Sequence, residues 1–139
     1  MNMKANELRI GNWVFLKSKQ NPYQIWHSHD IEEIADAPIN FDAEPIPLTA
    51  EWLLKFGFVE KNLGKKLPQN WYELKYLSNE HEELITSWVS ILINSNSLSC
   101  VICDEHPDEM GANTKRPIKY VHQLQNLYFA LTGEELTIK

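Results

Sequence analysis

The chain has 139 residues, a formal net charge of −6 and 43% hydrophobic residues. A chain of this length and apolar content can bury a core as one domain, residues 1–139, which argues against intrinsic disorder. The negative charge argues against general nucleic-acid binding, which needs lysine and arginine to replace counterions. No apolar run is long enough to span a membrane, and the N-terminus turns polar where a signal peptide turns apolar. We therefore expect a cytoplasmic protein.

The first third of the chain is expected to supply strands. Leu8–Leu16 is a candidate first strand or strand pair, with a bend or bulge where Gly11 and Asn12 interrupt it. Tyr23–Ile34 alternates loosely and is predicted to be a second strand. Ala35–Pro47 contains three prolines, which remove backbone donors, so we expect an irregular connection there.

Two segments carry helix signals. Thr49 is a good N-cap, Glu51 lies in the first turn where the helix dipole favours it, and Gly57 suits the C-terminal end. A second helix is predicted to end at Gly133. Its apolar residues recur every three or four positions: Tyr120, Val121, Leu124, Leu127, Tyr128 and Leu131.

The middle of the chain predicts three more strands. These are Trp71–Leu77, Leu84–Ile93 and Leu98–Cys103, the last two forming a hairpin. Asp104–Pro117 is polar and acidic and is expected to be a mobile loop, and the tail Glu134–Lys139 is expected to be loose.

The predicted fold class is α+β. We expect about five mostly antiparallel strands in a strongly bent sheet or small open barrel, with one short middle helix and a C-terminal helix. Eight carboxylates and one lysine lie between Asp30 and Glu60. This acidic stretch is interpreted as solvated surface, with a docking face for a basic partner as the alternative.

Cysteine spacing gives a weak metal signal. Cys100 and Cys103 precede His106, but residues three apart on a strand point to opposite faces. One cysteine pair also supplies too few thiolates for a structural zinc, so ordinary packing is the favoured interpretation and no metal or cofactor is predicted.

A histidine pair offers a second possible site. His27 and His29 would share a face of a strand, and with Asp30 or Glu33 they could bind a metal or act as acid and base. Packing or edge positions are the favoured interpretation. An enzyme built on this pair, or on His106 with its acidic neighbours Asp104 and Glu105, is held as the third functional hypothesis.

Positive and aromatic side chains suggest a place for a small ligand. Such groups can hold a phosphate or stack on a base, although solvated loop ends are the commoner explanation. The candidate ligand-binding residues are Lys61, Lys65, Trp71, Arg116, His122 and Gln125.

The C-terminal helix carries a second face behind its apolar stripe. His122, Gln125, Asn126 and Phe129 lie on it, and an exposed Phe129 among amides would be a contact for a partner or a base. The alternative, which we favour, is that Phe129 is also core because the helix is covered on two sides.

Three blocks of sequence resemble a known group of proteins. They are LRIGNWV (residues 8–14), IPLTAEWLLKFGF (46–58) and IKYVHQLQNLYFALTG (118–133). Together they resemble a family of short, functionally uncharacterised proteins from Bacteroidetes genomes and from their phages and mobile elements. The resemblance implies a small accessory protein and gives no catalytic residue. The opening Gly11-Asn12-Trp13-Val14 is also similar to the first strand of small Src-homology-type barrels, which concerns fold alone.

The leading functional hypothesis is a non-enzymatic binding or adaptor protein, encoded by a phage or mobile element, that acts on a host component. It predicts a protein partner or self-association through exposed aromatic residues. The alternative is a protein that binds or sequesters a small nucleotide.

Overall fold

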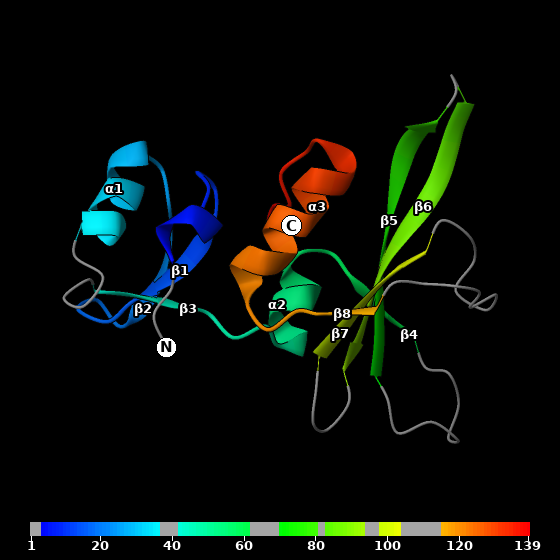
Figure 1. The fold of residues 1–139 in the computed structure, drawn as a ribbon. Helices are drawn as coiled ribbons and strands as arrows, with labels where there is room; N and C mark the ends of the chain where they lie inside the picture. Colours follow the sequence, from blue (N-terminus) through cyan, green and yellow to red (C-terminus); the bar gives the residue numbers. More distant parts are fainter. Residues whose placement is uncertain (1–3, 37–41, 62–69, 81–82, 94–97, 104–114) are drawn as a thin grey trace. The chain divides into compact units, whose positions relative to one another are not determined.

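The computed structural model describes residues 4–36, 42–61, 70–80, 83–93, 98–103 and 115–139. These residues form an α+β structure with antiparallel strands (Figure 1). No helix among them is both long and apolar enough to cross a membrane. In chain order the elements are η1 (Ala5–Glu7, a 3-10 helix), β1 (Trp13–Leu16), β2 (Asn21–Gln24), α1 (Ser28–Asp36), β3 (Ala43–Pro45), α2 (Ala50–Lys55), β4 (Val59–Lys61), β5 (Asn70–Glu80), β6 (Glu83–Ile93), β7 (Leu98–Cys103), β8 (Lys115–Pro117) and α3 (Val121–Thr132).

The chain divides into two compact units, each made of two separate stretches of sequence. Unit 1 contains Met1–Leu48 and Lys119–Glu135, and unit 2 contains Thr49–Ile118 and Leu136–Lys139. Unit 1 holds a three-stranded sheet in the order β2-β1-β3, and unit 2 a five-stranded sheet in the order β4-β5-β6-β7-β8. The described strands thus form two open sheets, where the sequence predicted one bent sheet or small open barrel.

The sheet of unit 1 tolerates two prolines because both lie at its edges. Pro22 in β2 pairs with Phe15, and Pro45 in β3 pairs with Val14, while the central strand β1 has no proline. Ala35–Pro47 was predicted to be irregular, and this was wrong for β3, since proline can stand in an edge strand when its missing N–H faces away from the partner.

The interruption predicted at Gly11 is confirmed. The Asn12 N–H closes a turn onto the Arg9 carbonyl, and Gly11 has a φ of 97°, which a side chain would strain. Both Gly11 and Asn12 then face Ile25: the Gly11 N–H donates to the Ile25 carbonyl and the Asn12 carbonyl accepts from the Ile25 N–H. Two residues that face one residue of the neighbouring strand form a β-bulge. Because of this bulge, the regular strand β1 begins only at Trp13.

A small core holds unit 1 together. Leu8, Val14 and Ile25 are almost fully buried, and Ile31 from α1 packs against them. Tyr23–Ile34 was predicted to be a strand, and this was wrong beyond Gln24. The spacing of Ile31, Ile34 and Ala35 is helical, and the carboxylate of Asp30 accepts the N–H groups of Trp26 and His27, which favours a helix start.

Unit 2 contains the predicted middle helix. Thr49 accepts a hydrogen bond from the Trp52 N–H at 3.4 Å, and Gly57 follows the helix with a φ of 89°. Trp52, Leu53 and Phe56 are buried, as the apolar stripe predicted. The hairpin of β6 and β7 is also confirmed, and β5 pairs with β6 along its whole length.

Two segments predicted to lack structure have it. Lys115–Pro117 forms β8 and pairs with β7, while residues 104–114 of the predicted mobile loop lie outside the described residues. In the tail, Leu136 is only 3% exposed and the Lys139 N–H donates to the Lys55 carbonyl at 2.8 Å. Both depend on partners distant in sequence, which local composition does not reveal.

We expect a single cooperative unfolding transition, in line with the prediction of one domain. The chain passes from one unit to the other after residues 48, 118 and 135. If unit 2 alone unfolded, residues 49–118 would become one long loop whose two ends folded unit 1 still holds together. Chain entropy sets that cost on the order of 4 kcal/mol for a loop of this length. Calorimetric and van't Hoff enthalpies should then agree. Two resolved heat-capacity peaks would contradict the expectation.

Candidate functional site

Side chains from α3 hold the N-terminal segment of unit 1. Gln125 is fully buried; its Oε1 accepts the Trp13 N–H at 2.9 Å and its Nε2 donates to the Gly11 carbonyl at 2.9 Å. Backbone groups on alternate residues of an extended chain normally bind a neighbouring strand. The Gln125 amide therefore takes the place of a neighbouring strand at the start of β1.

A second amide extends this contact. Asn126 donates to the Glu7 carbonyl at 2.6 Å and accepts the Asn12 side-chain amide at 3.0 Å. Asn12 is itself fully buried and accepts the Arg9 N–H at 2.7 Å. The turn that carries Arg9 is thus fixed from both sides, because buried polar groups cost stability unless they are paired.

Arg9 is held by three neighbours at once. Its guanidinium pairs with Glu135, donates to Asn126 Oδ1 at 3.2 Å and stands over the Phe129 ring with its central carbon 3.8 Å from the ring centroid. Phe129 remains 38% exposed, so the favoured prediction that it is core was wrong. A planar cation over an aromatic face is a stabilising contact and makes the pair a defined surface.

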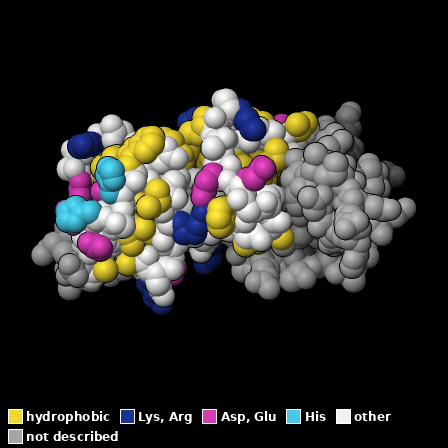
Figure 2. Space-filling model, turned by 90° about the horizontal axis from the view of Figure 1, so that it is seen from above, with side chains coloured by type: hydrophobic (Ala, Val, Ile, Leu, Met, Phe, Trp, Pro, Cys, Tyr) yellow, Lys and Arg dark blue, Asp and Glu magenta, His cyan; other side chains and the backbone are white. Residues whose placement is uncertain are grey.

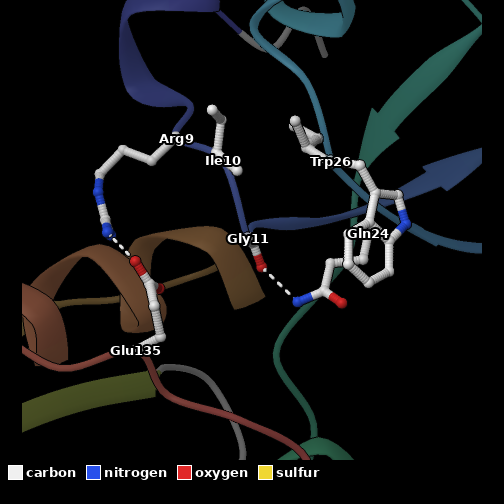
Figure 3. Close-up of a pocket in the computed structure, with 7 residues that line it drawn as sticks. Arg9, Ile10, Gly11, Gln24, Trp26 and Glu135 are labelled. Atoms are coloured by element: carbon white, nitrogen blue, oxygen red, sulfur yellow. Dashed lines mark hydrogen bonds and ion pairs between the residues drawn. The ribbon is translucent and has the colours of Figure 1, made fainter.

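An open groove of about 500 Å³ begins at this arginine (Figure 3). We call it the Trp26 groove. Its exposed apolar side chains are Trp26, 64% exposed, and Ile10, 52% exposed. Gln24 braces it by donating to the Gly11 carbonyl at 3.1 Å. The described residues that line it are Arg9, Ile10, Gly11, Gln24, Ile25, Trp26 and Glu135.

The Trp26 groove has a rigid frame. Ile25, the residue before Trp26, is hydrogen-bonded through its backbone to Gly11 and Asn12 of the bulge, and the Trp26 N–H donates to Asp30 at 3.3 Å. Gly11 cannot easily be replaced, because a Cβ there would lie 3.3 Å from Glu135 on a backbone with positive φ. Two large apolar side chains are thus presented to solvent from fixed backbone. In the space-filling view, apolar side chains reach the surface among charged ones over the described part of the chain (Figure 2).

His122, one of the predicted ligand residues, is buried rather than exposed. It is 1% exposed, stacks on the Tyr120 ring and finds no hydrogen-bond partner for either ring nitrogen among the described residues. Its Nε2 lies 3.7 Å from the Glu7 carboxylate, which is beyond hydrogen-bond distance. Burial lowers the pKa of His122 below its usual 6.5, and the nearby Glu7 charge offsets part of that effect.

The other predicted ligand residues are distributed over both units. Gln125 joins His122 in unit 1, where both the oxygen and the nitrogen of its amide are hydrogen-bonded to backbone groups. Lys61 and Trp71 are cross-strand partners on β4 and β5, and Arg116 lies on β8, all in unit 2. Lys65 lies outside the described residues. Neither His122 nor Gln125 is among the described residues that line the Trp26 groove, and the role of the six residues as a ligand site stays a prediction.

The histidine pair does not share a strand face. His29 lies in α1 with Nε2 3.0 Å from Glu33, while His27 precedes the helix and its N–H donates to Asp30. Both are exposed. Within the described ranges no three His, Cys, Asp or Glu side chains form a group suited to a metal. Cys100 and Cys103 lie on β7, as the strand argument required, while His106, Asp104 and Glu105 lie outside the described residues.

The sequence did not single out Arg9, Ile10 or Trp26. Trp26 was placed inside the predicted strand Tyr23–Ile34, without a role of its own. The bulge at Gly11 was the available signal, because bulges re-aim neighbouring side chains. What the signal lacked was the pairing of Gly11 with Ile25, which brings Ile10 and Trp26 to one groove.

Comparisons of the chain with protein-family models, with curated proteins and with solved structures return no match. The resemblance to the Bacteroidetes and phage family therefore stays a prediction.

We expect Gln125→Leu to destabilise the protein by about 1–3 kcal/mol, because a buried amide that joins Trp13 and Gly11 is lost. Chemical denaturation followed by circular dichroism measures the change. The control is Ala130→Leu, at an exposed position of the same helix, which should shift the unfolding free energy by no more than about 0.5 kcal/mol. Equal changes in unfolding free energy from the two substitutions would show that the hydrogen bonds of Gln125 to Trp13 and Gly11 do not stabilise the sheet.

We expect His122 to make stability depend on pH. Its folded pKa is lowered, so the unfolded chain binds more protons just below pH 6.5, and stability falls as the pH drops through that range. His122→Phe should remove this part of the slope when denaturation is compared above and below that range. Titration of the His122 ring by NMR at or above pH 6.5 would mean that attraction to Glu7 outweighs burial.

Proposed function

We propose that this is a non-enzymatic binding protein that contacts a partner protein, or a second copy of itself, through the Trp26 groove. The observation that carries the proposal is the exposure of Trp26 and Ile10, 64% and 52%, on backbone that hydrogen bonds hold in place. Tryptophan and arginine are the residues that most often dominate the free energy of protein association. A surface that is already ordered loses little entropy on binding.

The groove suits a protein side chain better than a phosphate. Arg9 is its cationic side chain, and that charge is already paired with Glu135. What the groove offers a ligand is therefore mainly apolar surface between Ile10 and Trp26. Apolar surface of this kind binds an aliphatic or aromatic side chain of a partner.

The setting belongs to the same proposal. We propose a cytoplasmic accessory protein of a phage or mobile element that acts on a host component. This part rests on the family resemblance and on the composition of the chain. The nucleotide-binding alternative stays a prediction.

The proposal is tested first by mass. If light scattering shows a concentration-dependent dimer, Trp26→Ala should weaken the dimer. Its dissociation constant should rise about tenfold or more, as expected for a central contact residue. The matched control is Leu54→Ala on α2, because Leu54 is also an apolar residue, 53% exposed, but lies in unit 2.

If the protein is a monomer, a photoreactive amino acid at position 26 tests the same surface. It should cross-link one protein in producing cells, and Ile10→Asp should abolish that product. The same probe at position 54 should not give it. A dimer unaffected by Trp26→Ala, or identical cross-links from positions 26 and 54, would overturn the proposal.

A further inference from the structure

Unit 1 contains a second hollow with a different chemistry. It has a volume of about 290 Å³ and a floor made by the apolar side chains of Val14, Leu16 and Ile25. We call it the acidic pocket, because its wall carries three carboxylates and one ammonium group. The wall residues are Ser18, Lys19, Tyr23, Asp30, Glu33 and Asp42.

The carboxylates of the acidic pocket are held in position. Asp42 accepts the Ser18 N–H at 2.7 Å and also the Ser18 hydroxyl. Asp30 accepts the Tyr23 hydroxyl at 3.4 Å and backbone N–H groups at the start of α1. Glu33 projects from the next turn of α1, is 54% exposed, and lies with Oε1 3.0 Å from the Nε2 of His29. The carboxylates of Asp30, Glu33 and Asp42 therefore line the same pocket as the apolar floor.

The negative charge of the acidic pocket affects the pKa of Tyr23, which lies in its wall. Desolvation raises the pKa of Tyr23 above 10.0, and the negative charges of Asp30 and Glu33 raise it further. An anionic ligand such as a phosphate would be repelled here. A volume of about 290 Å³ is also at the small end for ligand pockets, which favours one side chain over a nucleotide.

We propose that the acidic pocket receives a lysine or arginine side chain from a partner protein. The aliphatic stem would lie on Val14, Leu16 and Ile25, while the cationic head would meet the carboxylates of the wall. Lysine and arginine combine these two parts, since they bury an apolar stem and keep a charged head near polar groups. The three carboxylates of the wall outnumber the Lys19 ammonium group, so the charge of the pocket complements a cation.

The partner is a protein because this inference rests on the proposed function, in which unit 1 already contacts one through the Trp26 groove. The inference also gives the acidic stretch from Asp30 to Glu60 a specific role, because three of its carboxylates, those of Asp30, Glu33 and Asp42, line this pocket. Opposite charges also speed the encounter of partners by long-range attraction.

The test is an NMR titration of the full-length, isotope-labelled chain with Nα-acetyl-lysine methylamide, whose ε-ammonium group is free. We expect amide shifts at Tyr23, Asp30, Glu33 and Asp42. N-acetyl-norleucine methylamide has the same stem without the charge and should not shift them. Raising the salt to about 0.5 M should weaken binding, because the exposed part of the interaction is screened.

Two substitutions on α1 form a matched pair. Glu33→Gln should weaken binding of the lysine derivative about threefold, as expected for one partly exposed charge. Glu32→Gln removes the same charge from the neighbouring residue, which is 70% exposed and lies outside the pocket lining, and should leave binding unchanged.

Three results with the amino-acid derivatives and the substitutions would overturn the inference. They are equal shifts from the lysine and norleucine derivatives, no shift from either, and equal effects of the two substitutions. Shifts from spermidine without shifts from the lysine derivative would indicate a pocket for a free amine and would also reject a protein side chain. These readouts need no partner protein and no Trp26, so a failure here is distinct from a failure of the proposed function.

Discussion

The fold of unit 1 depends on one side-chain amide that acts as backbone. Gln125 bonds the Trp13 N–H and the Gly11 carbonyl, two groups that a strand would otherwise bind. The sheet of unit 1 has only three short strands, and its edge strands contain Pro22 and Pro45. Its ladder is therefore brief, and hydrogen bonds from α3 add what the strands cannot supply. Because α3 follows β1 by more than a hundred residues, the first and last parts of the chain must fold together.

That constraint also explains how the Trp26 groove can be exposed and ordered at once. Amides from α3 fix the turn at Arg9, and the bulge at Gly11 links this turn to Ile25, the residue before Trp26. An exposed tryptophan on loose backbone would have many orientations and would lose entropy when it bound. Here the cost of ordering the backbone is met during folding, so more of the contact energy remains for association.

The sequence predicted well what is encoded locally. The helices at Ala50–Lys55 and Val121–Thr132, with Gly57 and Gly133 after them, follow from caps and apolar spacing within a few residues. It failed where pairing with distant residues decides, as in β3, β8 and the tail. The candidate site belongs to the second group. Gln125 was recognised as a polar residue on a helix face, but its partners are backbone groups, and these carry no sequence signal of their own.

The polar face of α3 differs in hydrogen bonding along its length. Gln125 and Asn126 both make side-chain hydrogen bonds, whereas His122, which is as buried as Gln125, has no hydrogen-bond partner among the described residues. A buried imidazole without partners loses its hydration and gains little in return. Its nearest charge is Glu7, which lies at the end of η1, two residues before Arg9. Added charge on His122 would therefore act first on the segment that leads into the turn supporting the groove, and only through that segment on Trp26.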